Sequence, residues 1–257
     1  MYVKLPIAIL LASAAPAFAQ HDHAHDDHHH GHAAAGSLGA GVSVVAASFD
    51  TMYYAGDYQG IVPQARWSDA RFAVIASGAV HRLTANGAEY YGFGDVGIHG
   101  QVRLARVDTF DAGVLAGVTL PTGDERHGLG MGHVMLMPGV FAGWTVHRVR
   151  LAASIGYSRA LGGDSEHDHG AWPLVSPMLM AEVSWNAGAD VLVTPSVTAG
   201  ARASGGLPAG EGGPARSIVA GRVGWRRGRL DTAFELQAGV VGDPFTMRGV
   251  VSTALSF

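Results

Sequence analysis

The sequence predicts an all-β protein, a closed antiparallel transmembrane β-barrel of about 12 strands, and three observations lead to this. From about Gly36 onward, apolar and polar residues alternate with a period of two rather than 3.6. Short turns and long loops alternate along the chain, which is typical of bacterial outer-membrane barrels. Only 15% of the residues are charged, yet the chain lacks the apolar run of roughly 18 residues that a membrane-spanning helix needs.

The first residues have the pattern of a secretory signal peptide. Lys4 supplies a positive charge, and the apolar segment 5–15 that follows is too short to span a bilayer. Ala17-Phe18-Ala19 fits the small-x-small cleavage rule. We therefore expect residues 1–19 to be removed and the mature chain to begin at Gln20; the alternative is an uncleaved anchor helix.

A histidine-rich tract follows the predicted cleavage site. Residues 20–35 are too polar to bury a core, so we expect a disordered periplasmic tail, with residues 36–257 forming the barrel. Neutral imidazole binds copper, zinc and nickel ions. The tail is therefore a candidate for capturing a divalent metal, and the alternative is a solvated linker that binds metal only adventitiously. Its histidines are His21, His23, His25, His28, His29, His30 and His32.

The expected strands are read from the period-two pattern. In segment 95–106, for example, Val96, Ile98, Val102 and Leu104 fall on one face. Pro63, Pro138, Pro177 and Pro195 lie inside expected strands, where a missing N–H requires a bulge. The full set of expected strands is 37–49, 59–67, 71–82, 95–106, 110–120, 134–145, 149–160, 174–185, 190–201, 216–226, 230–241 and 247–257.

The connections between these strands are expected to differ on the two sides of the membrane. Short turns are predicted near 68–70, 107–109, 146–148, 186–189 and 227–229. Long loops are predicted at 50–58, 83–94, 121–133, 161–173 and 202–215. An even strand number places both termini on the short-turn side, which is periplasmic in bacterial barrels.

The two faces of the expected strands differ in chemistry. One face carries branched and aromatic residues and is predicted to contact lipid, whereas a water-soluble barrel would pack such residues inside. The other face carries small and charged residues and is predicted to line a narrow lumen, where arginines pair with acids such as Asp111, Glu182 or Glu235. The candidate lumen residues are His99, Gln101, Arg103, Asp111, Arg150, Glu182, Arg222 and Glu235.

Aromatic residues mark the membrane boundary. Trp67, Trp144, Trp185 and Trp225 lie in the lipid-facing phase, each next to an expected short turn, and predict a periplasmic aromatic girdle. The last strand ends on Phe257 and resembles the signal that barrel-insertion machinery reads in outer-membrane proteins. Outer-membrane lipid and that machinery are therefore expected partners, with the protein located in the outer membrane of a Gram-negative bacterium.

Two segments in the middle of the chain carry a family resemblance. They are 92–96, Gly-Phe-Gly-Asp-Val, and 117–124, Gly-Val-Thr-Leu-Pro-Thr-Gly-Asp. Over roughly residues 92–132 the chain resembles a family of outer-membrane barrels named for the meta-pathway of phenol degradation. The resemblance implies a barrel that transports a small organic compound. The histidine-rich tail and the His/Met segments are not part of that pattern.

Histidine and methionine also recur beyond the tail. His127, Met131, His133 and Met135 lie on a long loop and the strand after it, and Met137 continues the same inward phase. Thioether sulfur favours Cu(I) and imidazole binds several transition metals, so these residues are candidate ligands. His167 and His169 on another loop are a further candidate surface site. The alternative is a lumen simply filled by flexible methionines.

Composition excludes several other functions. The absence of cysteine excludes thiolate sites and disulfides, and a net charge of −4 argues against a nucleic-acid partner. No motif singles out a nucleophile, so the sequence predicts no enzyme and no required cofactor. A Cu or Zn ion is a candidate ligand only. We expect an outer-membrane channel or solute-binding barrel for a small solute or metal ion, linked to copper or zinc handling. The alternatives are a passive channel for small organic or aromatic compounds and a metal-buffering or structural barrel without transport.

Overall fold

The computed structural model describes residues 36–50, 55–162, 172, 179–210, 215–242 and 245–257. The predicted signal peptide and histidine-rich tail lie outside the described residues. Among the residues described, no helix has the length and apolarity needed to cross a membrane. The elements are β1 (Ser37–Asp50), β2 (Ala55–Ser68), β3 (Phe72–Ser77), β4 (Val80–Ala85), β5 (Ala88–Phe93), β6 (Val96–Val107), β7 (Phe110–Leu120), η1 (Glu125–His127), β8 (Val134–Val146), β9 (Val149–Leu161), β10 (Ala181–Thr194), β11 (Val197–Pro208), β12 (Arg216–Arg227), β13 (Leu230–Val241) and β14 (Phe245–Ser256).

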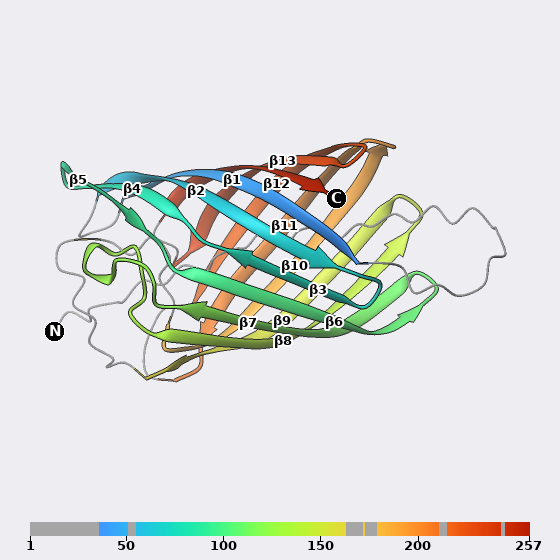
Figure 1. Cartoon of the computed structure of the whole chain (residues 1–257), viewed down its shortest axis with the longest axis horizontal. Coiled ribbons are helices and arrows are strands. Elements are labelled where there is room, and N and C mark those ends of the chain that lie inside the picture. Colours follow the sequence, from blue (N-terminus) through green and yellow to red (C-terminus); the bar gives the residue numbers. More distant parts are fainter. Residues whose placement is uncertain (1–35, 51–54, 163–171, 173–178, 211–214, 243–244) are drawn as a thin grey trace.

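These strands form one antiparallel sheet that closes on itself (Figure 1). From β6 to β14, each strand pairs with the one that follows it, and β1 pairs with both β14 and β2. β3 and β4 pair with different halves of β2, while β6 pairs with β3 and β5 pairs with β4. The 14 strands therefore occupy 12 positions around the barrel, which confirms the predicted closed barrel.

The two ends of the barrel differ as the sequence predicted, but the predicted long loop at 50–58 is wrong, because β1 ends at Asp50 and β2 begins at Ala55, which pairs with Asp50. Turns at 69–71, 108–109, 147–148, 195–196 and 228–229 lie at one end, which we call the turn end. The start of β1 and the end of β14 also lie there, because Gly39 pairs with Ser256. The opposite end, which carries the longer connections, is called the loop end.

The outer surface of the barrel is apolar. Leu38, Ile61 and Ile155 expose 57%, 55% and 53% of their surface, and each points away from the lumen. Glu235 and Arg248, which occupy inward positions, are buried. A water-soluble barrel would show the opposite arrangement. The predicted outward placement of the apolar residues is therefore confirmed, and it is typical of a transmembrane barrel.

The predicted aromatic girdle forms at the turn end, with one exception. Trp67, Phe72, Trp144 and Trp225 point outward close to the turns. Trp185 was wrongly placed: it lies inside β10, paired with Ile155 and Gly205, far from the turn at 195–196.

The error at Trp185 reflects a shift of two expected strands. The structure replaces strands 174–185 and 190–201 by β10 and β11, and the expected turn at 186–189 lies within β10. Asn186-Ala187-Gly188 resembles a turn, but Gly188 serves another purpose. A Cβ there would lie 2.9 Å from Cγ of Arg202, so the glycine makes room for that side chain. The predicted loop 202–215 accordingly begins only after Pro208.

The predicted long loop at 83–94 is also wrong. Residues 80–93 form a hairpin, β4–β5, which projects at the loop end (Figure 1). Its turn is Asn86-Gly87, and both residues have positive φ values, 50° and 84°. This is the two-residue turn whose twist matches that of paired strands, and Asn-Gly is its strongest sequence signal.

The prolines inside strands lie where the hydrogen-bond ladder is already interrupted. Pro63 faces the gap between β3 and β4, and its carbonyl accepts a bond from the N–H of Gly78. The β8–β9 register lacks pairs at Met137 and Pro138. Pro195 lies in a turn rather than a strand, and Pro177 is outside the described residues.

Candidate functional site

The candidate site is the lumen, and its wall differs along its length. The structure places all eight predicted lumen residues at inward positions, because each shares a face with buried polar neighbours or with other inward residues across the strands. Several of them contact partners that the sequence had not singled out. The contacts are described from the loop end toward the turn end.

Near the loop end, Glu182 and Arg216 form a buried ion pair. Arg216 Nη2 lies 2.6 Å from Oε1 and 2.7 Å from Oε2 of Glu182, and Nε lies 3.1 Å from Oε2. The two side chains expose only 3% and 2% of their surface. A Cβ on Gly206 would lie 2.3 Å from the carboxylate, so this glycine leaves the space that Glu182 fills. The two opposite charges balance each other, and the surrounding protein shields both side chains from solvent.

A second enclosed network lies on β13 and β14. Gln237 donates a hydrogen bond from its amide to Glu235, and its carbonyl accepts one from Arg248 Nε at 2.7 Å. Arg248 also donates to the hydroxyl of Tyr58 at 3.3 Å, and its guanidinium lies 4.3 Å above the ring centre of Phe245. Glu235, Gln237 and Arg248 are all buried, so their polar groups are engaged with one another.

Toward the turn end, the charged groups of the wall are only loosely paired. Arg150 Nη2 lies 3.9 Å from Asp111, and Arg202 Nη2 lies 3.7 Å from Asp190. These four side chains remain between 14% and 28% exposed. Arg222 pairs in register with Gly200 and Glu235 and stands close to Arg202. We call Arg103, Arg150, Arg202 and Arg222, with Asp111 and Asp190, the arginine belt.

Glycines keep the belt against the wall. A Cβ on Gly143 would lie 2.6 Å from the carboxylate of Asp111, and one on Gly200 would lie 2.1 Å from that of Asp190. Each acidic side chain therefore lies flat over a neighbouring glycine instead of crossing the lumen.

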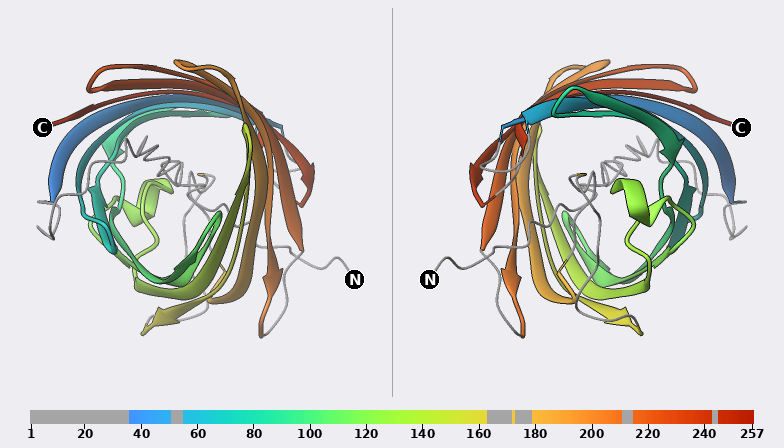
Figure 2. Two further views of the ribbon diagram at one scale, coloured as in Figure 1. Left: turned by 90° about the vertical axis from the view of Figure 1, so that its right-hand side faces the viewer. Right: turned by 90° about the vertical axis from the view of Figure 1, so that its left-hand side faces the viewer.

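The connection between β7 and β8 folds into the loop end of the barrel. We call residues 121–133 the mouth loop; they include η1, which lies within the ring of strands when the barrel is viewed along its length (Figure 2). Asp95 holds both ends of this loop, because its carboxylate accepts hydrogen bonds from the N–H groups of Gly123 and Met131, each at 2.8 Å. Gly123 and Gly130 pack backbone to backbone, so a Cβ on either would lie within 2.9 Å of the other. The segments that carry the family resemblance thus supply the clamp of the mouth loop.

Aromatic and polar contacts hold the outer side of the mouth loop. Asp124 accepts hydrogen bonds from the Tyr90 hydroxyl at 2.5 Å and interacts with His127 Nδ1 at 2.9 Å. The rings of Tyr90 and His127 stack with centres 3.6 Å apart, and Trp172 packs against both. The hydrogen bond from Tyr90, supported by His127, lowers the pKa of Asp124 below its usual 3.8, and the same bond raises the pKa of Tyr90 above 10.0.

The inner side of the mouth loop closes onto an apolar cluster. Leu129 packs in this cluster and is 3% exposed. The cluster fills the inward face at the loop end, where a polar lumen had been predicted. Its buried members are Val45, Ala47, Phe49, Tyr58, Leu83, Ala85, Leu129, Ile218 and Phe245.

The predicted metal ligands are only partly brought together. His133 Nε2 lies 3.1 Å from Met135 Sδ, and both residues are buried, as is Met131. Met131 and His133 belong to the mouth loop, and Met135 belongs to β8. His127 instead stacks on Tyr90 at the outer side. The described residues contain no group of three or more His, Cys, Asp or Glu suited to a metal ion. The tail histidines, His167 and His169 lie outside the described residues.

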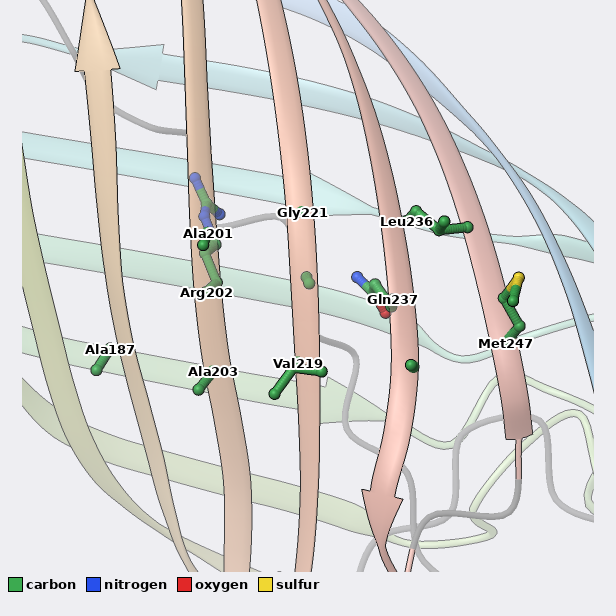
Figure 3. Close-up of a pocket in the computed structure, with 11 residues that line it drawn as sticks. Ala187, Ala201, Arg202, Ala203, Val219, Gly221, Leu236, Gln237 and Met247 are labelled. Atoms are coloured by element: carbon green, nitrogen blue, oxygen red, sulfur yellow. The ribbon is translucent and has the colours of Figure 1, made fainter.

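One hollow of about 500 Å³ lies on the lipid-facing side of β10–β14 and not in the lumen (Figure 3). Small outward residues form its floor, and Val219, Leu236 and Met247 rise around it. The hollow therefore belongs to the apolar outer face of the barrel and not to the lumen wall. Its lining is Ala187, Ala201, Arg202, Ala203, Val219, Ala220, Gly221, Leu236, Gln237, Ala238 and Met247.

Three determinants of the wall escaped the sequence analysis. Arg202 was assigned to a loop because of the strand shift, and its partner Asp190 was not singled out. Arg216 lies at a predicted strand start, where no periodicity signals a partner. The Gly-Asp motif did mark Asp95, but no local pattern indicated that its carboxylate clamps a loop.

Comparison with known proteins supports the fold. No family model and no curated protein matches the chain. Among solved structures, the KdgM porin matches with 8% identity over 84% of this chain and 99% of that one, at a TM-score of 0.54. The NanC porin matches with 10% identity over 84% and 98%, also at 0.54. The translocator domain of autotransporter NalP from Neisseria meningitidis matches with 11% identity over 90% of both chains, at 0.56. At such identities the likeness concerns the barrel architecture.

Proposed function

We propose that this protein is a passive outer-membrane channel for a small hydrophilic solute. The observation that carries this proposal is the arginine belt, a set of accessible charges lining an interior enclosed by an apolar outer wall. A barrel needed only as a structural element would gain more stability from an apolar interior than from loosely paired charges. Two proteins of similar architecture, KdgM and NanC, are named as porins, which supports the proposal.

In this proposal the turn end is periplasmic and the loop end faces outward. This orientation follows the usual arrangement of bacterial barrels, with short periplasmic turns and longer external loops. The mouth loop then narrows the external entrance, and the arginine belt lies beyond it, toward the periplasm. Passage from outside requires the solute to move around the mouth loop or the loop to yield.

Planar-bilayer recording tests the proposal. The full chain, purified from outer membranes of its expression host, is expected to insert and give discrete conductance steps in KCl. A companion variant, Leu129→Asp, places a carboxylate in the apolar cluster and displaces the mouth loop. Conductance from either protein supports the channel. If neither conducts, while circular dichroism shows a folded barrel, the channel is excluded in favour of a structural barrel without transport.

Binding of a soft metal ion is a second candidate function. Its supporting observation is the approach of His133 Nε2 to Met135 Sδ, a nitrogen and a thioether donor of the kind that Cu(I) accepts. The histidine-rich tail adds donors on the periplasmic side. In this role the protein captures or buffers a copper or zinc ion, with or without transport.

Calorimetric titration with silver(I), a redox-stable analogue of Cu(I), tests the metal candidate. Met135→Leu is expected to weaken binding to the barrel, and Met247→Leu, an outward methionine, serves as the matched control. Deletion of residues 20–35 separates the tail from the barrel. Unchanged binding in both the deletion and Met135→Leu would contradict the metal role.

The resemblance to the phenol-pathway family supports one alternative cargo, a small organic or aromatic compound. Liposome flux of a neutral aromatic alongside a small ion separates this cargo from the proposed one. A barrel that passes the aromatic and excludes the ion would favour the alternative.

A further inference from the structure

We infer that the lumen selects oxyanions, such as small carboxylates and phosphates, over cations. This inference rests on the proposed channel function and names its substrate class. It comes from the arginine belt, where four arginines face two carboxylates, Asp111 and Asp190. The nearby Glu235 is buried and accepts a hydrogen bond from the amide of Gln237, whose carbonyl accepts one from Arg248. With Glu235 and Arg248 included, five arginines still face three carboxylates.

The charges of the belt are accessible to a passing solute. The Arg150–Asp111 and Arg202–Asp190 contacts, at 3.9 and 3.7 Å, exceed hydrogen-bond length, whereas the enclosed Arg216–Glu182 pair lies at 2.6 Å. The belt side chains also retain 14–28% exposure, compared with 2–3% in the enclosed pair. The guanidinium group of Arg202 therefore keeps donors that an entering anion can use.

Arg222 is the strongest single candidate for contact with an anion. Within the part of the chain that the structure describes, its guanidinium makes no hydrogen bond and no ion pair within 4 Å. It lies across Gly200 from the Asp190 carboxylate, and it feels the charge of the neighbouring Arg202 as well as those of Asp190, Glu235 and Asp231. Two adjacent guanidinium groups repel each other, and a bridging oxyanion relieves that repulsion.

Arg103 extends the positive wall toward β6. Its Nη1 donates to the backbone carbonyl of Ala70 at 2.9 Å, and its Nε has no hydrogen-bond partner among the described residues. Arginine stays charged at all physiological pH values, and the chain has no lysine beyond Lys4. A fixed excess of guanidinium groups in a low-dielectric wall attracts anions and repels cations, as charged rings do in selective pores.

The chemistry of guanidinium narrows the class of anion. Its planar set of donors matches the two oxygens of a carboxylate or phosphate, and such bidentate pairs are stronger than contacts with a spherical ion. We therefore expect small oxyanions to interact with the belt more strongly than chloride.

Reversal potentials in a KCl gradient near ~0.1 M, where screening is moderate, test the inference. The reversal potential of the wild-type channel is expected on the anion-selective side of zero. If the mouth loop blocks current through wild type, the same result is expected for Leu129→Asp. Arg222→Gln should move it toward zero, and Arg222→Glu should move it to the cation-selective side. Arg229→Gln, an exposed arginine in the turn at 228–229, removes the same charge outside the lumen and should cause no shift.

A second measurement addresses the preferred anion. Millimolar inorganic phosphate or acetate should reduce chloride current through the wild-type channel, and the reduction should weaken at least several-fold in Arg222→Gln. A conducting barrel with a cation-selective or zero potential overturns the inference and leaves the channel intact. Absence of current from both wild type and Leu129→Asp overturns the channel and this inference together.

Discussion

The two halves of the barrel wall use the same inward-facing positions in opposite ways. At the loop end, Leu83, Met135 and Phe245 are 0–1% exposed, and the Arg216–Glu182 pair is enclosed. Toward the turn end, glycines line the wall and the ion pairs of the arginine belt are long and accessible. An inward-facing charge therefore stabilises the structure at the loop end, where it is buried in an ion pair. Toward the turn end, an inward-facing charge remains exposed to the lumen. Hydrogen-bond geometry, and not residue type, distinguishes the two.

The largest effect is expected from breaking the enclosed pair. Arg216→Ala leaves the Glu182 carboxylate buried without its partner, which should lower the free energy of unfolding by about 3–5 kcal/mol. Arg202→Ala is the matched variant in the belt, and its loose contact with Asp190 should be worth less than about 1 kcal/mol. Urea unfolding in phospholipid vesicles measures both. Equal losses would show that the two halves do not differ in the way described.

Next in size is the effect of displacing the mouth loop. In Leu129→Asp, an unpaired carboxylate in the apolar cluster destabilises the inward position of the loop, so the single-channel conductance should rise several-fold. Leu129→Met conserves volume and apolarity and should leave conductance close to wild type. A conductance that is the same in all three proteins would mean that the mouth loop does not restrict the entrance.

The sequence predicted the part of this comparison that depends on periodicity. Alternation assigned Arg150, Arg222 and Glu235 to the lumen, because side chains two residues apart share a face regardless of exact strand ends. The prediction of β10 and β11 was wrong because the local sequence does not distinguish a glycine inside a strand from a glycine in a turn. Gly188 is needed for the stem of Arg202, a residue fourteen positions away that only the register brings close.

The inward fold of the mouth loop was beyond the reach of the sequence. Its residues 121–133 have the composition of an ordinary external loop. Two interactions hold these residues inward. Asp95 binds two backbone N–H groups of the loop, and the loop packs on the apolar cluster formed by β1, β2, β4, β12 and β14. Those contacts join segments far apart in the chain, and local patterns do not record them. The Asn86-Gly87 turn, in contrast, was a local signal that could have been used.

The contacts of Asp124 with Tyr90 and His127 should make the conductance depend on pH. The effect should be smaller than that of Leu129→Asp. The Tyr90 hydrogen bond holds the pKa of Asp124 below 3.8, so this carboxylate stabilises the closed loop above that pH, and the contribution is lost as the pH falls through the lowered value. Conductance should therefore rise only below about pH 4. Asp124→Asn should remove this acid response, and a response unchanged in that variant would assign it to another group.

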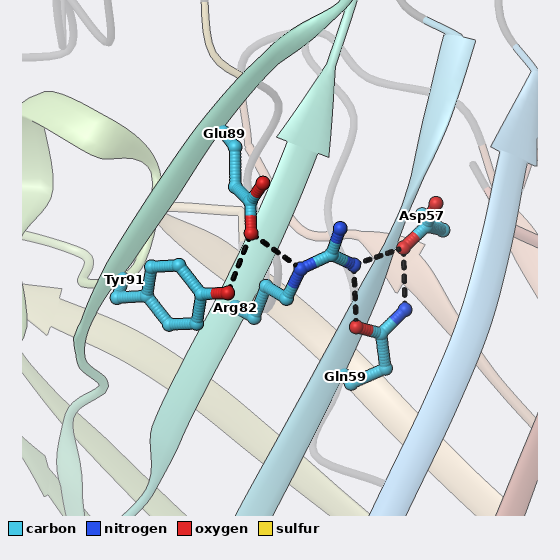
Figure 4. Close-up of polar contacts among 5 residues, drawn as sticks. All are labelled: Asp57, Gln59, Arg82, Glu89 and Tyr91. Atoms are coloured by element: carbon cyan, nitrogen blue, oxygen red, sulfur yellow. Dashed lines mark hydrogen bonds and ion pairs between the residues drawn. The ribbon is translucent and has the colours of Figure 1, made fainter.

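The smallest effect is expected from a polar network on the outer surface at the loop end (Figure 4). Arg82 donates to Glu89 at 2.7 Å, to Gln59 at 2.6 Å and to Asp57 at 3.1 Å, and Tyr91 donates to Glu89 at 2.5 Å. These groups lie on the β4–β5 hairpin and the adjoining part of β2, where the outer face changes from apolar to polar above Ile61.

Judged by contact distances alone, the Arg82 network would be expected to stabilise the protein as much as the enclosed Arg216–Glu182 pair, because its contacts are as short. Exposure separates them: the side chains of Arg82, Asp57 and Glu89 are 34–44% exposed, so water and salt screen their charges. Arg82→Gln should therefore leave urea unfolding within error of wild type and leave the reversal potential unshifted. A loss comparable to that of Arg216→Ala would mean that this outward network is enclosed in the membrane and that the polar boundary lies further from the turn end.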